Sequence, residues 1–262
     1  MLRQPLFSKK NILRLFASLF LLILPLILVS NTLPHKNPKW HSLTPGIEYL
    51  DLAGGFLTPW SHIHVFKIDL KHNQLALVTA KEIKKLLANA DEFANKRRAL
   101  IAINGGFFDK KFNPLGLRIT HYKTISSLKN ISWWGVFYIK NRQAHIVSKS
   151  QFSKSSDISF AIQAGPRLLI NGHSPHLKPG RAQRTALGIN HDGKLIILVT
   201  DNSPLSTVEL AEIMKRTPLN CDNAINLDGG SSTQLHANFP DFQLSVHGFA
   251  NVSDAIIVKP TT

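Results

Sequence analysis

Residues 187–200, LGINHDGKLIILVT, contain two apolar runs on either side of His191-Asp192-Gly193. The Asp-Gly pair supplies the positive φ that a tight hairpin turn requires. We therefore predict that 187–190 and 194–200 are the two strands of an antiparallel β-hairpin.

Working outward from this hairpin, strand signals dominate the rest of the chain. Residues 63–70 and 74–79 alternate between apolar and polar types, and further apolar runs suited to strands lie at 100–103, 136–139 and 256–258. Two helices are predicted against this background. The first spans 81–98, where apolar residues recur at helical spacing. The second spans 207–216, where Ser206 and Glu209 form a capping box. The predicted fold class is α+β: a mixed, mainly antiparallel β-sheet core flanked by a few helices.

Length and composition indicate a folded globule. The 262 residues can bury a sizeable core, and 44% are hydrophobic while 18% are charged. These values exclude a disordered or collagen-like chain. A single cysteine, Cys221, excludes an internal disulfide, a four-thiolate zinc site and a CxxC redox pair.

The N-terminus predicts export. A basic stretch runs into 15–29, LFASLFLLILPLILV, whose length fits the apolar core of a signal peptide. An uncleaved signal anchor in the cytoplasmic membrane is the alternative, and both place the domain in the periplasm or outside the cell. Residues 31–45 contain three prolines among polar residues and predict a linker. The predicted organisation is a signal segment over 1–30, a linker over 31–45 and one domain over 46–262.

The charge balance predicts an anionic partner. Four of the 31 Lys and Arg lie in the first fourteen residues, which leaves 27 against 16 Asp and Glu. This excess favours contact with phosphates, anionic glycans or a membrane surface. No zinc-finger spacing, RNP-like run or basic helix with interleaved aromatics is present, so we predict no nucleic-acid partner.

Two segments have the pattern of a binding pocket. Residues 103–109, INGGFFD, and 225–233, INLDGGSST, each follow an apolar strand with a polar residue and two glycines. Glycines allow backbone amides to approach a ligand closely, although Gly105-Gly106 alone also fits a simple turn. Together the two strand ends predict one pocket.

Arginines and a further carboxylate lie at other predicted strand ends. Arg167 ends the segment 163–167, and Arg184-Thr185 opens another strand, so two guanidinium groups are expected to clamp a phosphate. Each arginine alone also fits an ordinary surface position. Asp201, at the end of the 195–200 strand, is expected to face the same cleft.

Several other patterns in the sequence do not predict a functional site. Residues 188–194 match the first part of the phosphate-loop motif, which is a glycine, any four residues and then Gly-Lys. The motif needs Ser or Thr at the next position, where this sequence has Leu195. Ser231 lacks a nucleophile elbow. His62 and His64 alternate onto one strand face without an evident third ligand, so no metal site is predicted. Trp133-Trp134 fits a core-and-rim pair better than a sugar platform. Glu209 fits the capping box better than a catalytic acid.

Four blocks of sequence resemble the phosphodiester glycosidase family. In chain order they are AINGGFF at 102–108, QAGPRLL at 163–169 with Asn171-Gly172, RTALG at 184–188, and NLDGGSST at 226–233. The resemblance covers about 95–258. It departs at Ser231, where the family usually has a third glycine.

The resemblance implies hydrolysis between the anomeric carbon of a sugar and a phosphate esterified to a second group, without a cofactor. Asp228 is then expected to act as nucleophile or general base, with Asp201 or Asp109 as partner. Arg167 and Arg184 are expected to bind the phosphate, beside Thr185. The remaining candidate substrate contacts are the sugar-binding Asn104, Ser232 and Thr233, and the amides around Gly105, Gly106, Gly229 and Gly230.

Two other interpretations of the site stay open. A non-catalytic carbohydrate or phosphoglycan-binding module would keep Arg167 and Arg184 without depending on Asp228. The other is an enzyme in which water attacks phosphorus instead of carbon, so that the oxygen of the attacking water ends up in the phosphate product.

Overall fold

All strand pairings in the described residues are antiparallel. The structure is a computed structural model that describes residues 39–52 and 58–261. The predicted signal segment, 1–30, lies outside the described residues. The first sheet follows the order β1 (His41–Thr44), β2 (Ile47–Asp51), β3 (His62–Ile68), β13 (Leu195–Asp201), β12 (Thr185–Asn190), β14 (Cys221–Asn226) and β11 (Arg167–Leu169).

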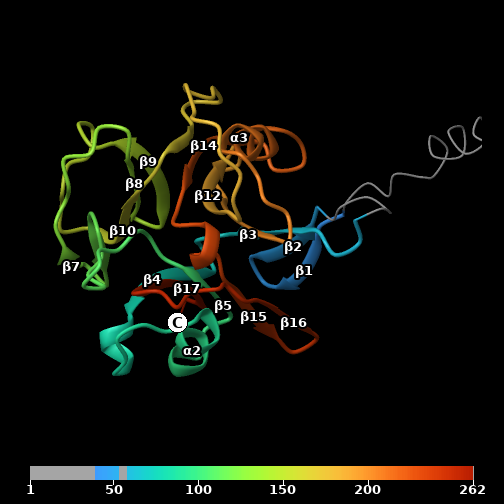
Figure 1. Ribbon diagram of the computed structural model, residues 1–262, viewed down its shortest axis with the longest axis horizontal. Coiled ribbons are helices and arrows are strands. Elements are labelled where there is room, and N and C mark those ends of the chain that lie inside the picture. The colour runs from blue at the N-terminus through green and yellow to red at the C-terminus, as the bar shows by residue number, and fades with distance from the viewer. Residues whose placement is uncertain (1–38, 53–57, 262) are drawn as a thin grey trace, which may run out of the picture. The chain divides into compact units, whose positions relative to one another are not determined.

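Two five-stranded sheets complete the β-structure of the described residues. One follows the order β7 (Lys123–Ser126), β6 (Arg118–Thr120), β10 (Ile158–Ala164), β8 (Gly135–Lys140) and β9 (Gln143–Ser148). The other follows the order β16 (Phe242–Val246), β15 (Leu235–Phe239), β5 (Ile101–Asn104), β17 (Asp254–Pro260) and β4 (Asn73–Thr79). Figure 1 shows the three sheets set around a common centre.

The helical part of the described chain is small. It consists of the α-helices α2 (Ala90–Arg97) and α3 (Thr207–Lys215) and the short 3-10 helices η1 (Ala80–Ile83) and η2 (Gly230–Ser232). The mainly antiparallel core and the few helices agree with the sequence prediction. The description as a mixed α+β fold needs correction, since the domain is richer in strand than a balanced α+β fold.

The predicted hairpin is confirmed as β12 and β13. Thr185 pairs with Val199 and Ile189 pairs with Leu195. Gly193 in the turn has a φ of 71°, in the left-handed region that glycine adopts without strain.

The predicted helix at 81–98 is wrong in its extent, because two separate caps divide it. Thr79 caps η1 and Asn89 caps α2, each in a capping box with a Glu three residues later. Lys84, in the left-handed conformation, ends the first helix. Leu86, which the helical pattern placed on the buried face, is 61% exposed. The second predicted helix is confirmed as α3, with its capping box of Ser206 and Glu209.

The predicted linker also needs correction where the structure describes it. Residues 41–44 form β1, which pairs with β2 through the turn at Pro45-Gly46. Gly46 has a φ of 77°. Pro45 therefore belongs to a hairpin turn, a position in which proline and glycine are as common as they are in linkers. Among the described residues, no helix has the length and hydropathy to cross a membrane.

The main hydrophobic core lies between the three sheets. Phe66 of β3, Ile103 of β5 and Phe137 of β8 are fully buried members of this one cluster. A second cluster packs α3 on the other face of the seven-stranded sheet, and a third packs α2 on β5 and β17. In Figure 1 the chain leaves β14 and enters η2 near the centre of the view, between the sheets. Strand ends from different sheets therefore meet there.

Candidate active site

Asn104, at the end of β5, joins the strand ends that the sequence predicted to meet. Its buried side-chain oxygen accepts hydrogen bonds from Thr185 Oγ1 at 2.6 Å and from the Gln234 amide at 3.1 Å. Its amide nitrogen donates to the carbonyls of Asp228 at 2.9 Å and Gly105 at 3.2 Å. These four bonds occupy the Asn104 side chain, which the sequence analysis assigned to a sugar hydroxyl. Asn104 is thus placed to position Asp228 instead.

Gly105 and Gly106 lie against a buried ion pair. Arg118 Nε is 3.3 Å from Asp254 Oδ2, and both side chains are fully buried. A Cβ atom on Gly105 would lie 1.7 Å from Asp254 Oδ1, and one on Gly106 would lie 2.3 Å from Arg118 Nη2. The two glycines are therefore required by this ion pair.

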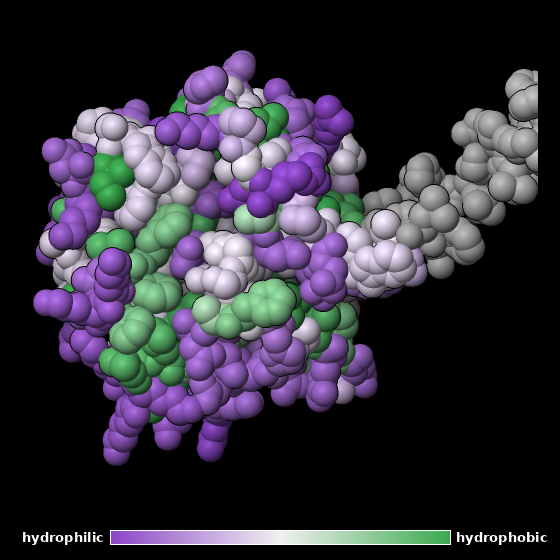
Figure 2. All heavy atoms as spheres, in the orientation of Figure 1, coloured by the Kyte–Doolittle hydropathy of each residue, from purple (hydrophilic) through white to green (hydrophobic). Residues whose placement is uncertain are grey.

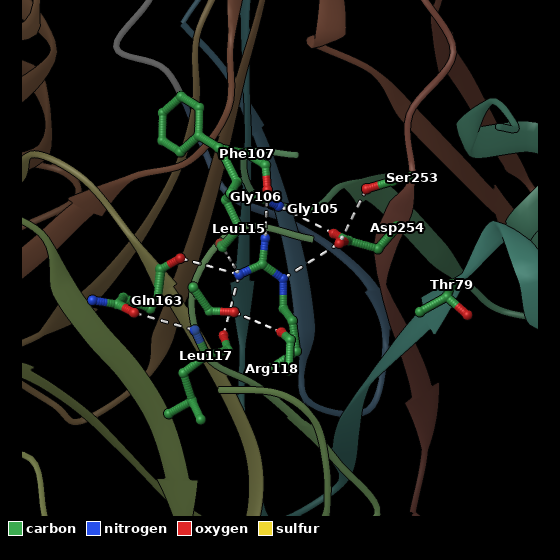
Figure 3. A network of polar contacts seen from close by, with 12 residues as sticks. Thr79, Gly105, Gly106, Phe107, Leu115, Leu117, Arg118, Gln163, Ser253 and Asp254 are labelled. Atoms are coloured by element: carbon green, nitrogen blue, oxygen red, sulfur yellow. Dashed lines mark hydrogen bonds and ion pairs between the residues drawn. The ribbon is translucent and has the colours of Figure 1, made fainter. Parts of the chain in front are cut away.

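The amides of the same glycines are also taken up by Asp254. The Gly105 amide donates to the Asp254 carbonyl at 2.9 Å, and the Gly106 amide donates to Asp254 Oδ1 at 3.2 Å (Figure 3). The predicted use of these amides for a ligand oxyanion is therefore not supported.

Arg118 fixes the surrounding loops. Its Nη1 donates to the carbonyls of Leu115, Leu117 and Gln163, each at 3.1 Å, and its Nη2 donates to that of Phe107 at 3.2 Å (Figure 3). Burial raises the pKa of Asp254, and the Arg118 charge opposes this rise. Neither Arg118 nor Asp254 was predicted from the sequence as a site residue. The only signal was a charged residue at position 118, within the apolar run LGLRI.

Asp228, two residues after β14, is a partly buried carboxylate. Its Oδ1 accepts a hydrogen bond from the Gly229 amide at 2.9 Å. Burial raises the pKa of Asp228 and the Asp254 charge adds to the rise, while hydrogen bonds from Ser232 and Gly229 and the Arg118 charge lower it. A carboxylate of raised pKa suits proton transfer near neutral pH.

The loop after Asp228 brings hydroxyl groups to the same place. Ser232 is buried and its side chain hydrogen-bonds Asp228. Thr233 is also buried, and its Oγ1 has no hydrogen-bond partner. The Gly230 amide donates to the Gln183 carbonyl at 2.8 Å. Since the Gly229 amide is occupied by Asp228, neither glycine amide supplies the predicted oxyanion contact.

The predicted clamp of two arginines is not formed. Arg167 pairs with Ile225, whose side chain lies in the core between the sheets. Arg184 lies one residue before Thr185 and so points to the opposite face of the same sheet. There its Nε donates to the Leu205 carbonyl at 2.8 Å, and its Nη2 donates to the Gly180 carbonyl. Arg184 therefore anchors two loops on the α3 side.

Arg167 remains available for an anion. Its Nε is buried without a hydrogen-bond partner, and its aliphatic stem packs on the backbone of Gly135. Burial lowers its pKa. Asn226 Oδ1 and Trp134 Nε1 are buried and unpartnered as well. A partly buried guanidinium group whose Nε has no partner within the protein is a candidate to bind an anion.

The two proposed partner carboxylates differ in their surroundings, and only Asp109 is held by its own loop. Asp109 accepts hydrogen bonds from the amides of Lys111 at 2.8 Å and Asn113 at 2.9 Å, and the bond from Asn113 is the main cause of its lowered pKa. Asp109 thus holds its own loop. Asp201 pairs with His62 at the end of β13. The carboxylate whose charge the structure couples to Asp228 is Asp254.

His62 and His64 form a cluster near the edge of the same sheet. His62 Nδ1 is 2.7 Å from Asp51 Oδ2, and His64 Nδ1 is 2.9 Å from the Tyr49 hydroxyl. The two imidazole rings stack with centroids 5.4 Å apart. Within the described part of the chain, no group of three or more His, Cys, Asp or Glu is placed to hold a metal ion.

Glu209 and the tryptophan pair have structural places. Glu209 completes the capping box of α3 and pairs with Arg181 at 2.6 Å. Hydrogen bonds from Ser206 are the main cause of its pKa, which is lowered to about 2. Trp134 is 5% exposed and Trp133 is 59% exposed, which matches the predicted core-and-rim pair.

Comparisons with known proteins support the family resemblance. The sequence is 32% identical over 141 residues to the uncharacterised protein YigE of Escherichia coli, covering 49% of this chain and 55% of that one. The chain therefore spans about half the length of this curated relative.

The fold resembles two solved structures. The catalytic domain of zebrafish N-acetylglucosamine-1-phosphodiester alpha-N-acetylglucosaminidase, auto-inhibited by its pro-peptide, matches with a TM-score of 0.61 at 19% identity, over 83% of this chain and 85% of that one. A hypothetical protein from Synechocystis matches with a TM-score of 0.59 at 17% identity, over 86% of this chain and 64% of that one. The family model for phosphodiester glycosidases matches residues 97–259, more than half of the chain, and the chain belongs to this family.

Proposed function

We propose that the protein is an exported hydrolase that cleaves the glycosidic bond of a sugar-1-phosphodiester in an envelope or extracellular glycoconjugate. The observation that carries the proposal is the position and environment of the Asp228 carboxylate. Asn104 holds its backbone at the junction of β5, β12 and β14, and burial raises its pKa. The family match supports the reaction class.

Arg167 is the proposed phosphate-binding residue. A sugar-1-phosphodiester carries one negative charge, and that charge grows on the leaving phosphate as the bond to the anomeric carbon breaks. Arg167 lies on β11, next to β14, with its Nε unpartnered. A guanidinium group at this position binds the phosphate and stabilises the developing charge.

Asp228 is the proposed general base. Water attacks the anomeric carbon and Asp228 takes its proton. The carbon–oxygen bond breaks with its electron pair going to the phosphate oxygen, so the products are the free sugar and a phosphomonoester. Because a phosphate is a good leaving group, one carboxylate is sufficient, and Asp254 stays in its ion pair with Arg118.

Export is proposed from the N-terminal sequence. Its basic stretch and fifteen-residue apolar run fit a signal peptide or a membrane anchor. Both place the domain where envelope or extracellular glycans are found. The excess of Lys and Arg over Asp and Glu supports an anionic substrate.

The test is hydrolysis of UDP-N-acetylglucosamine and UDP-glucose by the purified protein. We expect release of free sugar, with a loss of at least about 10²-fold in Asp228→Asn. Asp109→Asn is the matched control and should retain turnover. In ¹⁸O-labelled water, the label should enter the sugar. Label in the phosphate would exclude attack at carbon, and binding without turnover would favour the non-catalytic module.

A further inference from the structure

Two strongly exposed aromatic rings belong to segments that border the candidate site. Trp133 is 59% exposed and Phe249 is 98% exposed. A third exposed aromatic, Tyr122, is 65% exposed in the turn between β6 and β7. It borders a cavity with Asn73 and Thr261, at the opposite strand ends of β4 and β17 from those that meet near Asp254. Tyr122 is therefore a suitable control residue for substitutions at Trp133 and Phe249.

Trp133 lies on the Arg167 side of the site. Its ring packs edge-on against Trp134 with centroids 5.8 Å apart, and Trp134 stacks on Phe107 at 5.0 Å. The Phe107 carbonyl is bound by the buried Arg118. A Cβ atom on Gly165, two residues before Arg167, would lie 3.2 Å from the Trp133 carbonyl. These contacts hold Trp133 on a rigid base beside the proposed phosphate position.

Phe249 lies on the Ser231 side. The Ala250 amide donates to the Ser231 carbonyl at 3.0 Å, and Gln234 Nε2 donates to the Ala250 carbonyl at 2.6 Å. A Cβ atom on Gly248 would lie 2.5 Å from the same Ser231 carbonyl. The segment that carries Phe249 is thus held against the loop that follows Asp228.

The surface around these segments suits a carbohydrate. Figure 2 shows weakly polar and apolar residues across the middle of this face, with hydrophilic residues along its margins. Sugar rings present an apolar C–H face to an aromatic ring and hydroxyl groups to polar neighbours. Large aromatic side chains supply such contact area at isolated points. The core of a protein–protein interface would instead require adjoining apolar side chains.

We propose that the site binds an extended glycan, with one sugar ring stacked on Trp133 and another on Phe249, on either side of the reacting phosphodiester. The position of the reacting bond rests on the proposed function, whereas the glycan binding does not. The substrate class is an oligosaccharide or polysaccharide phosphodiester of at least two sugar units. A small sugar nucleotide would engage only part of this surface.

The test measures binding by the full-length protein with isothermal titration calorimetry. The probes are glucose-, mannose-, galactose- and N-acetylglucosamine-based oligosaccharides of one to six units. We expect affinity in at least one series to rise about tenfold or more from one unit to four. Trp133→Ala and Phe249→Ala should each remove this gain, and Tyr122→Ala should keep it.

Absence of a length-dependent gain in every series would overturn the proposal, as would a gain that survives both substitutions. The reaction itself is tested separately. Length-dependent binding without hydrolysis of any sugar phosphodiester would reject the proposed function and leave the glycan site standing. Hydrolysis without length-dependent binding would support the proposed function and reject the glycan site.

Discussion

The two glycine-containing strand ends, 103–109 and 226–233, look alike in sequence but differ in what surrounds them. Gly105 and Gly106 face the buried pair of Arg118 and Asp254, with no room for a Cβ atom. In the second segment a Cβ atom on Gly229 would lie 2.7 Å from the Gln183 carbonyl oxygen, whereas Gly230 has no atom within 4 Å of the position that a Cβ would occupy. The first segment is a packed support, and the second carries Asp228 into a partly open position.

Two of the buried polar atoms without partners lie on the second segment. Asn104 and Arg118 of the support have their hydrogen bonds inside the protein. On the other side, Thr233 Oγ1 and Asn226 Oδ1 are buried without partners. A bound ligand is one explanation for a buried polar atom that lacks a partner within the protein.

The largest expected difference between the two segments is in the stability lost when a glycine of each is replaced by alanine. Gly105→Ala places its Cβ on Asp254 Oδ1 and disrupts the buried ion pair, so we expect a loss of about 3–5 kcal/mol in the free energy of unfolding. Gly230→Ala should cost only about 1–2 kcal/mol, from its left-handed backbone with φ of 62°. Urea denaturation measures both.

Gly180→Ala is the control for these measurements, because its Cβ would meet no atom within 4 Å and its φ is not in the left-handed region. The free energy of unfolding of Gly180→Ala should stay within about 0.5 kcal/mol of the native value. Equal losses for Gly105→Ala and Gly230→Ala would show that the two strand ends do not differ in packing.

The two arginines offer a second comparison with a smaller effect. Arg184→Gln removes hydrogen bonds to the carbonyls of Leu205 and Gly180, and should lower stability by about 1–3 kcal/mol with little effect on ligand affinity. Arg167→Gln should leave stability within about 0.5 kcal/mol and weaken binding of UDP about tenfold. Thermal unfolding and calorimetric titration with UDP distinguish them. Weaker UDP binding by Arg184→Gln with unchanged binding by Arg167→Gln would instead assign phosphate binding to Arg184.

Local sequence patterns predicted the parts of the fold that depend on neighbouring residues. The hairpin of β12 and β13 followed from Asp192-Gly193, and α3 followed from the capping box of Ser206 and Glu209. The same reasoning failed at 81–98, because the end of η1 at Lys84 and the cap of α2 at Asn89 were hidden in one continuous helical pattern.

The site was predicted in part for a similar reason. Asn104, Thr185 and Asp228 were found as polar residues at strand ends, and the structure brings them together. The pair of Arg118 and Asp254 joins residues 136 positions apart, and neither has a local motif. The failure of the arginine clamp has another cause. A position one residue along a strand points to the opposite face, and the register of β11 and β12 was unknown.

The smallest expected effect is the pH dependence of stability at Asp228. Burial raises its pKa in the folded protein, so the folded state binds this proton more tightly than the unfolded state. Stability from this group is greatest when it is protonated, and falls as pH rises from about 3.9, the ordinary Asp value, through the raised pKa. Asp228→Asn removes this loss. Its stability relative to the native protein should therefore increase across that range, measured by urea denaturation from pH 3 to pH 7.

Asp109→Asn is the control with the opposite sign. The hydrogen bond from the Asn113 amide is the main cause of the lowered pKa of Asp109, so its ionised form stabilises the folded state. That contribution is present above the ordinary Asp value and is lost as pH falls through the lowered one. The Asp109→Asn variant should lose stability relative to the native protein as pH rises. Curves of the same sign for both variants would mean that the two carboxylates experience the same environment, and the distinction between the reacting position and the loop carboxylate would fail.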